Sequence, residues 1–180
     1  MHDSPPRLGM LFLTLTVTLL PGPAPAQSSA QLVREAREKL ASAVRSGDTN
    51  AFLEALDRVL ERQDRRAVRD AVGDYARLAE KLRKGGRRED LYFVHNKAAR
   101  AFQSVRGKAA LEEIHRQRTR GREPLGRLLL LDAAVFHDGL DLEQCSLEAL
   151  RDRSPLVVRR ALRYLARDGK RSVVEAVVER

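Results

Sequence analysis

The sequence predicts an all-α protein. Apolar residues recur at spacings of three and four through almost the whole chain after residue 27, which is the period of an amphipathic helix. No segment alternates apolar and polar residues as a half-buried strand does. Glycine or proline falls between the periodic segments, where helices end or begin. We expect about nine helices of roughly 9 to 18 residues, joined by short turns.

The first 26 residues have the pattern of a secretory signal peptide. Arg7 precedes an uncharged apolar run over residues 8–20, and three prolines follow the run directly. The run is 13 residues long, short of the roughly 20 that span a bilayer. Ala24 and Ala26 are the small residues that a signal peptidase reads. We therefore expect cleavage between Ala26 and Gln27, and a protein that is secreted or periplasmic.

The helical segments follow in order. Residues 27–48 predict an N-terminal leader helix that stops at Gly47, and residues 49–63 and 64–86 predict the next two helices. The Gly-Gly pair at residues 85–86 ends the third.

The later segments continue the pattern. Residues 88–105 and the short, charged segment 107–121 are helical by period. Pro124 and Pro155 each open a helix, because proline fits the first helical turn. The remaining helices are expected over 123–139, 141–153, 154–169 and 170–180. The last has an apolar face that requires cover, from its own repeat, from another chain or from further sequence.

The basic excess of the chain is concentrated in its middle third. The formal net charge is +9, and residues 57–122 hold 19 Lys and Arg against 10 Asp and Glu, a net of +9. Two clusters stand at expected turns, where they could bind phosphate, sulfate or carboxylate polymers or could simply be solvated. The residues of these two clusters are Arg83, Lys84, Arg87, Arg88, Arg116, Arg118, Arg120 and Arg122. Export and the scarcity of aromatic residues argue against nucleic acid as the physiological ligand.

No catalytic or metal-binding motif is recognisable. His95, His115 and His137 lie 20 and 22 residues apart, which is not a metal-ligand spacing. His137 is expected at a helix C-terminus, where it would interact with the last carbonyls. Cys145 is the only cysteine, so it forms no intramolecular disulfide, and we expect a buried, unreactive thiol. We expect no cofactor, no metal and no enzymatic activity.

Internal repetition favours a right-handed α-solenoid of antiparallel helix pairs. Arg69, Arg100, Arg127 and Arg159 stand in similar apolar settings at spacings of 31, 27 and 32 residues. Residues 147–180, which read LEALRDRSPLVVRRALRYLARDGKRSVVEAVVER, resemble a HEAT-type repeat, and residues 51–82 do so less closely.

The resemblance assigns structural roles within this repeat. It places an aspartate in the turn, a proline at the start of the second helix, an apolar stripe along that helix and an arginine on its outer side, within reach of the aspartate or of a neighbouring turn. These residues are Asp152, Pro155, Val158, Arg159, Ala161, Leu162 and Leu165. It implies a HEAT-like repeat domain over residues 49–180, of bacterial type given the leader. It specifies an architecture and no activity.

These observations leave three functional hypotheses. The first is a non-catalytic, exported scaffold that binds another, unidentified protein. The second is an electrostatic binder of anionic envelope polymers or of an anionic membrane surface through the arginine-rich turns. The third and weakest is an enzyme on a HEAT-like scaffold, which the absence of a convergent acid–base set disfavours.

Overall fold

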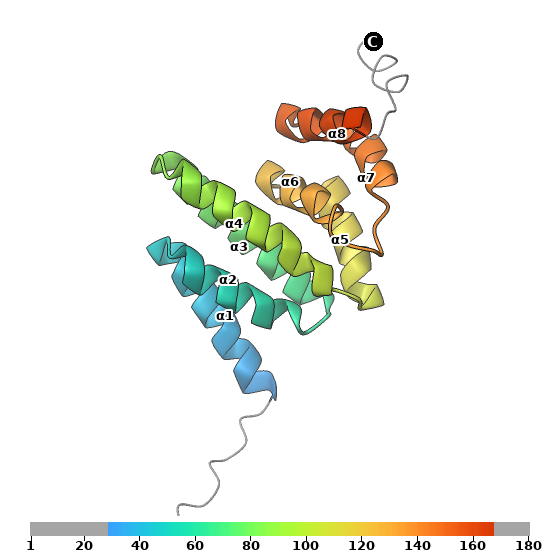
Figure 1. The fold of residues 1–180 in the computed structure, drawn as a ribbon. Helices are drawn as coiled ribbons and strands as arrows, with labels where there is room; N and C mark the ends of the chain where they lie inside the picture. Colours follow the sequence, from blue (N-terminus) through green and yellow to red (C-terminus); the bar gives the residue numbers. More distant parts are fainter. Residues whose placement is uncertain (1–28, 168–180) are drawn as a thin grey trace, which may run out of the picture.

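The computed structural model describes residues 29–167, and within them the chain is all-α, as the sequence predicts. This part forms eight α-helices and one short 3₁₀ helix, without a strand (Figure 1). The helices are α1 (Ser29–Ser46), α2 (Thr49–Leu60), α3 (Arg65–Lys84), α4 (Arg88–Ala101), η1 (Phe102–Ser104), α5 (Lys108–Arg120), α6 (Pro124–Ala133), α7 (Leu142–Ala149) and α8 (Pro155–Arg167). The expected signal peptide and the expected helix over 170–180 lie outside the described residues.

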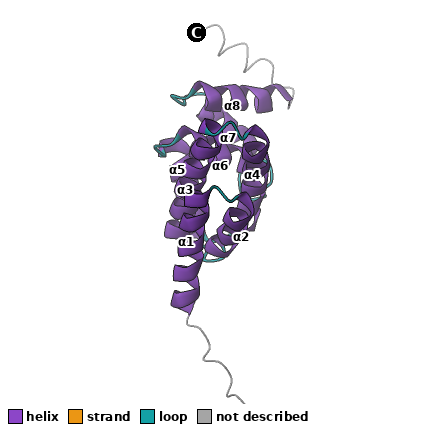
Figure 2. Ribbon diagram, turned by 90° about the vertical axis from the view of Figure 1, so that its left-hand side faces the viewer, coloured by secondary structure: helices purple, strands orange, loops and turns teal. Residues whose placement is uncertain are grey.

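The helices form two layers. Each of the pairs α1–α2, α3–α4, α5–α6 and α7–α8 is in contact. In one layer α1 contacts α3 and α3 contacts α5, while in the other α2 contacts α4, α4 contacts α6 and α6 contacts α8. Figure 1 shows α2, α4, α6 and α8 in successive rows that begin at the left, and Figure 2 shows the pairs stacked along the long direction of the molecule. The turns within the pairs therefore lie along one edge.

Local sequence signals explain where the helices begin and end. The carboxylate of Asp48 accepts hydrogen bonds from the backbone N–H groups of residues 50 and 51 at the start of α2, and Asp64 caps α3 in the same way. Pro124 and Pro155 are the first residues of α6 and α8, as expected. Gly47 adopts φ +79°, the left-handed conformation that ends α1.

The apolar core has two parts. The larger part joins α1 to α6 around Phe52, Tyr75 and Phe102, all of which are fully buried. The smaller part joins α6, α7 and α8 around Leu131 and Ala161. At the contact of α6 with α3 the backbone of Gly126 lies against the Val72 side chain, since a Cβ at Gly126 would lie 2.7 Å from Cγ1 of Val72.

The buried face of α8 differs by one position from the expected stripe. Ala161 and Leu165 are buried as predicted, but Val157 is buried in place of Val158. Val158 and Leu162 are only half-buried, so the prediction was wrong for these two residues.

The cause of this rotation is a polar anchor on α6. Asp132 accepts a hydrogen bond from the Tyr164 hydroxyl at 2.8 Å and pairs with Arg160 at 3.0 Å. Residues 157, 160, 161 and 164 share one helix face at i, i+3, i+4 and i+7, and this is the face that turns toward α6.

Candidate anion-binding groove

The first basic cluster, at the α3–α4 turn, is largely neutralised by neighbouring acids. Arg83 and Lys84 pair with Glu80 at 2.8 and 3.5 Å. Arg87 pairs with Asp90 at 2.7 Å, and its Nη1 also donates to the carbonyl of Gly47 at 2.9 Å, so it ties two turns together. Arg88 alone of this cluster forms no ion pair with a described residue.

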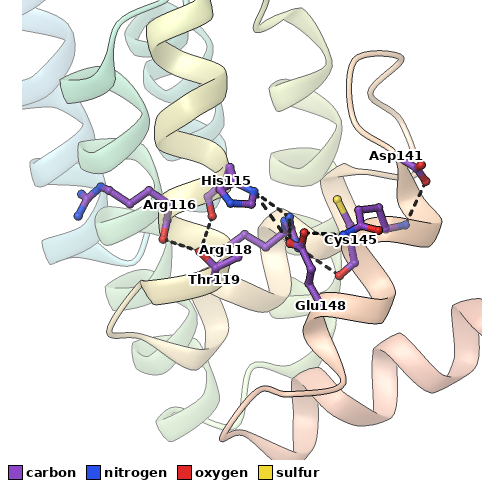
Figure 3. A network of polar contacts seen from close by, with 8 residues as sticks. His115, Arg116, Arg118, Thr119, Asp141, Cys145 and Glu148 are labelled. Atoms are coloured by element: carbon purple, nitrogen blue, oxygen red, sulfur yellow. Dashed lines mark hydrogen bonds and ion pairs between the residues drawn. The ribbon is translucent and has the colours of Figure 1, made fainter.

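Two residues of the second cluster are also engaged inside the protein. Arg116 donates to the buried Glu113 at 2.7 Å. Arg118, expected on an exposed turn, is buried, with 5% of its side chain exposed. Its guanidinium reaches from α5 to α7, where it donates to Glu148 at 2.7 Å and to the carbonyl of Cys145 at 3.1 Å (Figure 3). The expectation for Arg118 was therefore wrong, because the packing of α7 covers this end of α5.

Glu113 is the centre of the ties between α3 and α5. Hydrogen bonds from Arg116 and Gln117 and a longer one from Arg69 hold the pKa of Glu113 at about 2. Its carboxylate is buried, with 3% exposed, yet it keeps its charge because three donors surround it. Arg37 and Asp70 form an analogous ion pair between α1 and α3, at 2.9 Å.

The remaining arginines of the second cluster open onto a groove. This groove lies between the α5–α6 turn and the α7–α8 turn and has a volume of about 840 Å³. Four exposed arginines line it, namely Arg120, Arg122, Arg151 and Arg153. None of the four forms an ion pair within 4 Å to any residue in the part of the chain that the structure describes. Their charges are therefore available to a ligand.

The base of the groove is a buried ion pair. Arg127 of α6 donates through Nε and Nη2 to the two carboxylate oxygens of Asp152, at 2.6 and 2.8 Å. Nη1 of Arg127 donates to the carbonyls of Gly121 and Arg122, at 2.7 and 3.1 Å. Burial by itself would raise the pKa of Asp152, but the hydrogen bonds from Arg127 and from the N–H of Ser154 outweigh it and lower that pKa. Arg127 thus holds both turns in place.

The pairing at the base corrects one expectation. Arg159 was expected to reach Asp152 or a neighbouring turn, whereas the partner of Asp152 is Arg127 of the preceding helix pair. Arg159 is exposed and makes no ion pair with a described residue.

The sequence carries a repeated pattern at this groove. The expected basic clusters included its first copy, with Arg120 and Arg122, but not its second, with Arg151 and Arg153. Residues 120–124 read Arg-Gly-Arg-Glu-Pro, and residues 151–155 read Arg-Asp-Arg-Ser-Pro. Both follow the pattern Arg-x-Arg-x-Pro, at a spacing of 31 residues, and in both the proline is the first residue of a helix. The fold places the two turns on opposite sides of one groove.

Helix dipoles add to the positive potential. Pro124 and Pro155 belong to the groove lining, so the N-termini of α6 and α8 lie at the groove. Unpaired N–H groups at a helix N-terminus favour a nearby anion. The arrangement can therefore bind anionic groups through guanidinium forks, supported by two helix ends.

A second polar network, largely buried, resembles a catalytic triad in its order. The Tyr75 hydroxyl lies 2.5 Å from Nδ1 of His95, and Nε2 of His95 lies 2.6 Å from Asp132. Tyr75 is fully buried, and burial raises its pKa further above the ordinary value. The side chains of His95 and Asp132 are 12% and 6% exposed. The network joins α3, α4, α6 and, through Tyr164, α8.

Two further candidate chemical groups, Cys145 and His137, are buried. Cys145 is buried and burial raises the pKa of its thiol, which agrees with the unreactive role expected for it. His137 is buried in the loop after α6, beyond the end of the helix; its Nε2 lies 2.6 Å from the carbonyl of Val105, and its Nδ1 accepts from the N–H of Gly139. Within residues 29–167 no three His, Cys, Asp or Glu side chains are grouped as metal ligands.

Comparison of the chain with protein-family profiles, with curated proteins and with solved structures gives no match in any of the three. Among the helices of residues 29–167, none combines the length and the apolar character needed to cross a bilayer.

Proposed function

We propose that this chain is a non-catalytic, exported helical-repeat protein that binds an anionic partner in the groove between the α5–α6 and α7–α8 turns. The observation that carries the proposal is the set of four exposed arginines at this groove, none of which is paired with a described carboxylate. The buried guanidinium groups of Arg118 and Arg127, by contrast, are bound to carboxylates inside the protein. Four arginines that line one groove and lack a carboxylate partner make that groove suited to anion binding.

The same proposal includes a right-handed, HEAT-like solenoid as the scaffold. Its support is the alternation of contacts, odd helix to odd and even helix to even, together with the 31-residue spacing of the two Arg-x-Arg-x-Pro turns. In such an array the turns of successive pairs lie side by side, so a motif repeated in sequence becomes a row on one edge.

A salt-dependent binding assay tests the proposed function. Purified protein is titrated against immobilised long-chain polyphosphate and polyglutamate at several salt concentrations. Replacing the four groove arginines with glutamine should weaken binding on the order of 10²-fold, because several charge-assisted contacts are lost. A control variant changes four exposed basic residues outside the groove to glutamine. These are Lys39, Arg58, Arg163 and Arg167.

The control separates a local site from net charge. Both variants lower the formal charge by four, so a site at the groove requires that the control bind nearly as well as the wild type. Equal loss in both variants would show that only overall charge matters, and would contradict the proposal.

A second candidate function is protein binding through α4. Tyr92 and Phe93 are 74% and 43% exposed, and they line a hollow of about 350 Å³ together with Lys97 and Arg100. Exposed aromatic side chains are enriched at protein interfaces. An envelope-fraction pull-down washed at high salt tests it, since apolar contacts survive screening. Retention of the same protein by a variant with Tyr92→Ser and Phe93→Ser would contradict this function.

Export itself is testable at the N-terminus. The proposal expects the mature chain recovered from an envelope or culture fraction to begin at Gln27. An intact Met1 in that fraction would contradict cleavage of a signal peptide.

A further inference from the structure

We propose that the two Arg-x-Arg-x-Pro turns are two equivalent anion subsites and that they bind two phosphate groups of one linear phosphate polymer. This inference rests on the proposed function and specifies its ligand. It depends on the shared construction of the two turns and on the fixed distance between them.

The two turns have the same construction. Arg120 and Arg122 stand four and two residues before Pro124. Arg151 and Arg153 hold the same places before Pro155, so each turn presents an arginine pair at the N-terminus of a helix. Both helices are long enough for a helix dipole, with 10 and 13 residues. Two sites of the same construction are expected to bind the same chemical group.

The distance between the two turns is fixed by Arg127. A single side chain, Arg127, donates to the backbone of the first turn and to Asp152 in the second. Because this guanidinium is buried and each of its donor contacts is 3.1 Å or shorter, the two turns are held at one distance. Preorganised subsites favour a ligand that carries two anionic groups, since the second group binds at high effective concentration.

The groove lining limits the chemical class of the ligand. The groove lining contains no aromatic side chain, so it offers no surface on which a sugar or base could stack. Its one carboxylate, Asp152, is already paired with Arg127. Recognition must therefore come mainly from the charge and geometry of the anionic groups themselves.

Phosphate fits a pair of guanidinium groups better than carboxylate does. The two oxygens of a carboxylate lie in one plane and match one guanidinium fork. A phosphate presents oxygens in different planes and can accept from two forks at once, and each turn of this groove supplies two arginines. The linear polymer with phosphates along its length is thus the ligand class that engages both turns.

Calorimetric titration at constant ionic strength tests the inference, with orthophosphate, long-chain polyphosphate and polyglutamate as probes. We expect polyphosphate to bind on the order of 10² times more tightly per phosphate than orthophosphate. Neutralising the arginines of one turn should abolish most of the preference for polyphosphate over orthophosphate. The variants are Arg120→Gln with Arg122→Gln, and Arg151→Gln with Arg153→Gln. Orthophosphate should then still bind, at the one remaining turn. Arg163→Gln with Arg167→Gln is the matched control.

The outcomes separate the inference from the function on which it rests. Equal affinity per phosphate for orthophosphate and polyphosphate would overturn the two-subsite arrangement. Tighter binding of polyglutamate would overturn the phosphate class, while the groove would remain an anion site. No binding of any probe by wild-type protein would remove both the inference and the proposed function.

Discussion

The guanidinium of Arg127 and the carboxylate of Asp152 form a bidentate pair at 2.6 and 2.8 Å, although they lie 25 residues apart. The pair is buried, with 10% and 7% of the two side chains exposed. It joins the third helix pair to the turn of the fourth. The groove above it therefore depends on a contact that is itself hidden from the ligand.

Removing one member of this ion pair should destabilise the fold more than replacing both members with apolar residues. Arg127→Met leaves the Asp152 carboxylate buried without its partner, and we expect a loss of about 3 kcal/mol in the free energy of unfolding. The double variant with Asp152→Leu should recover part of that loss, because no buried charge remains. Urea unfolding of the two single variants and the double variant measures the coupling. Strictly additive losses would contradict a direct interaction.

Gly126 should not tolerate a methyl group. An added Cβ would lie 2.7 Å from Cγ1 of Val72, closer than packed carbons approach. Gly126→Ala should cost about 1–3 kcal/mol from overpacking, despite the better helix propensity of alanine. Gly73→Ala is the control, since nothing lies within 4 Å of the corresponding position and helix propensity predicts a gain. Thermal unfolding of both variants gives the signs, and a stabilised Gly126→Ala protein would contradict the close contact.

Glu113 should contribute an acid-sensitive part of the stability. Its pKa is about 2 in the folded protein, against an ordinary value of 4.5, so the folded state favours the ionised form. The sign follows: the contribution is complete above about pH 4.5 and is lost as the pH falls toward 2, on the order of 2 kcal/mol in all. Unfolding free energies across this range should therefore fall less steeply in Glu113→Gln than in the wild type. Parallel curves for the two proteins would exclude the predicted role.

Asp132 should anchor α8. It accepts from Tyr164, pairs with Arg160 and lies 2.6 Å from His95. Tyr164→Phe removes one hydrogen bond and should cost about 1 kcal/mol. Asp132→Ala removes the acceptor of all three groups and should cost about 3 kcal/mol, with α8 losing amide protection first. Hydrogen exchange measures this order, and unchanged protection in α8 would contradict the anchor.

The pKa of Tyr164 offers an independent check of the same anchor. Burial, together with the negative charge of Asp132, raises it to about 12. Ultraviolet titration of the phenol in Asp132→Asn should show ionisation at lower pH than in the wild type, because the repelling charge is gone.

The sequence predicted most of the helices because their signals are local. Apolar periodicity and the prolines at 124 and 155 act within a few residues, and the helices begin where those signals stand. The face of α8 was wrong by one position because Asp132, 28 residues upstream of Arg160, decides the rotation.

The site was harder to predict because the positions of arginines in the sequence do not show which of them will be paired with a carboxylate. Arg118 and Arg120 are two residues apart in one basic cluster, yet the first is buried against Glu148 and the second lines the groove. Which arginines remain free depends on carboxylates brought close by the tertiary fold. The Arg-x-Arg-x-Pro pattern repeated at residues 120–124 and 151–155 is the sequence signal that points to the groove.

The most direct test of the central claim is a backbone amide NMR titration of the purified protein with long-chain polyphosphate. We predict saturable shift changes confined to residues 119–124 and 151–156, on the two sides of the groove, with little change at the largely neutralised turn of residues 83–88. Shifts concentrated at residues 83–88, or spread in proportion to surface charge, would contradict a binding site between the two arginine turns.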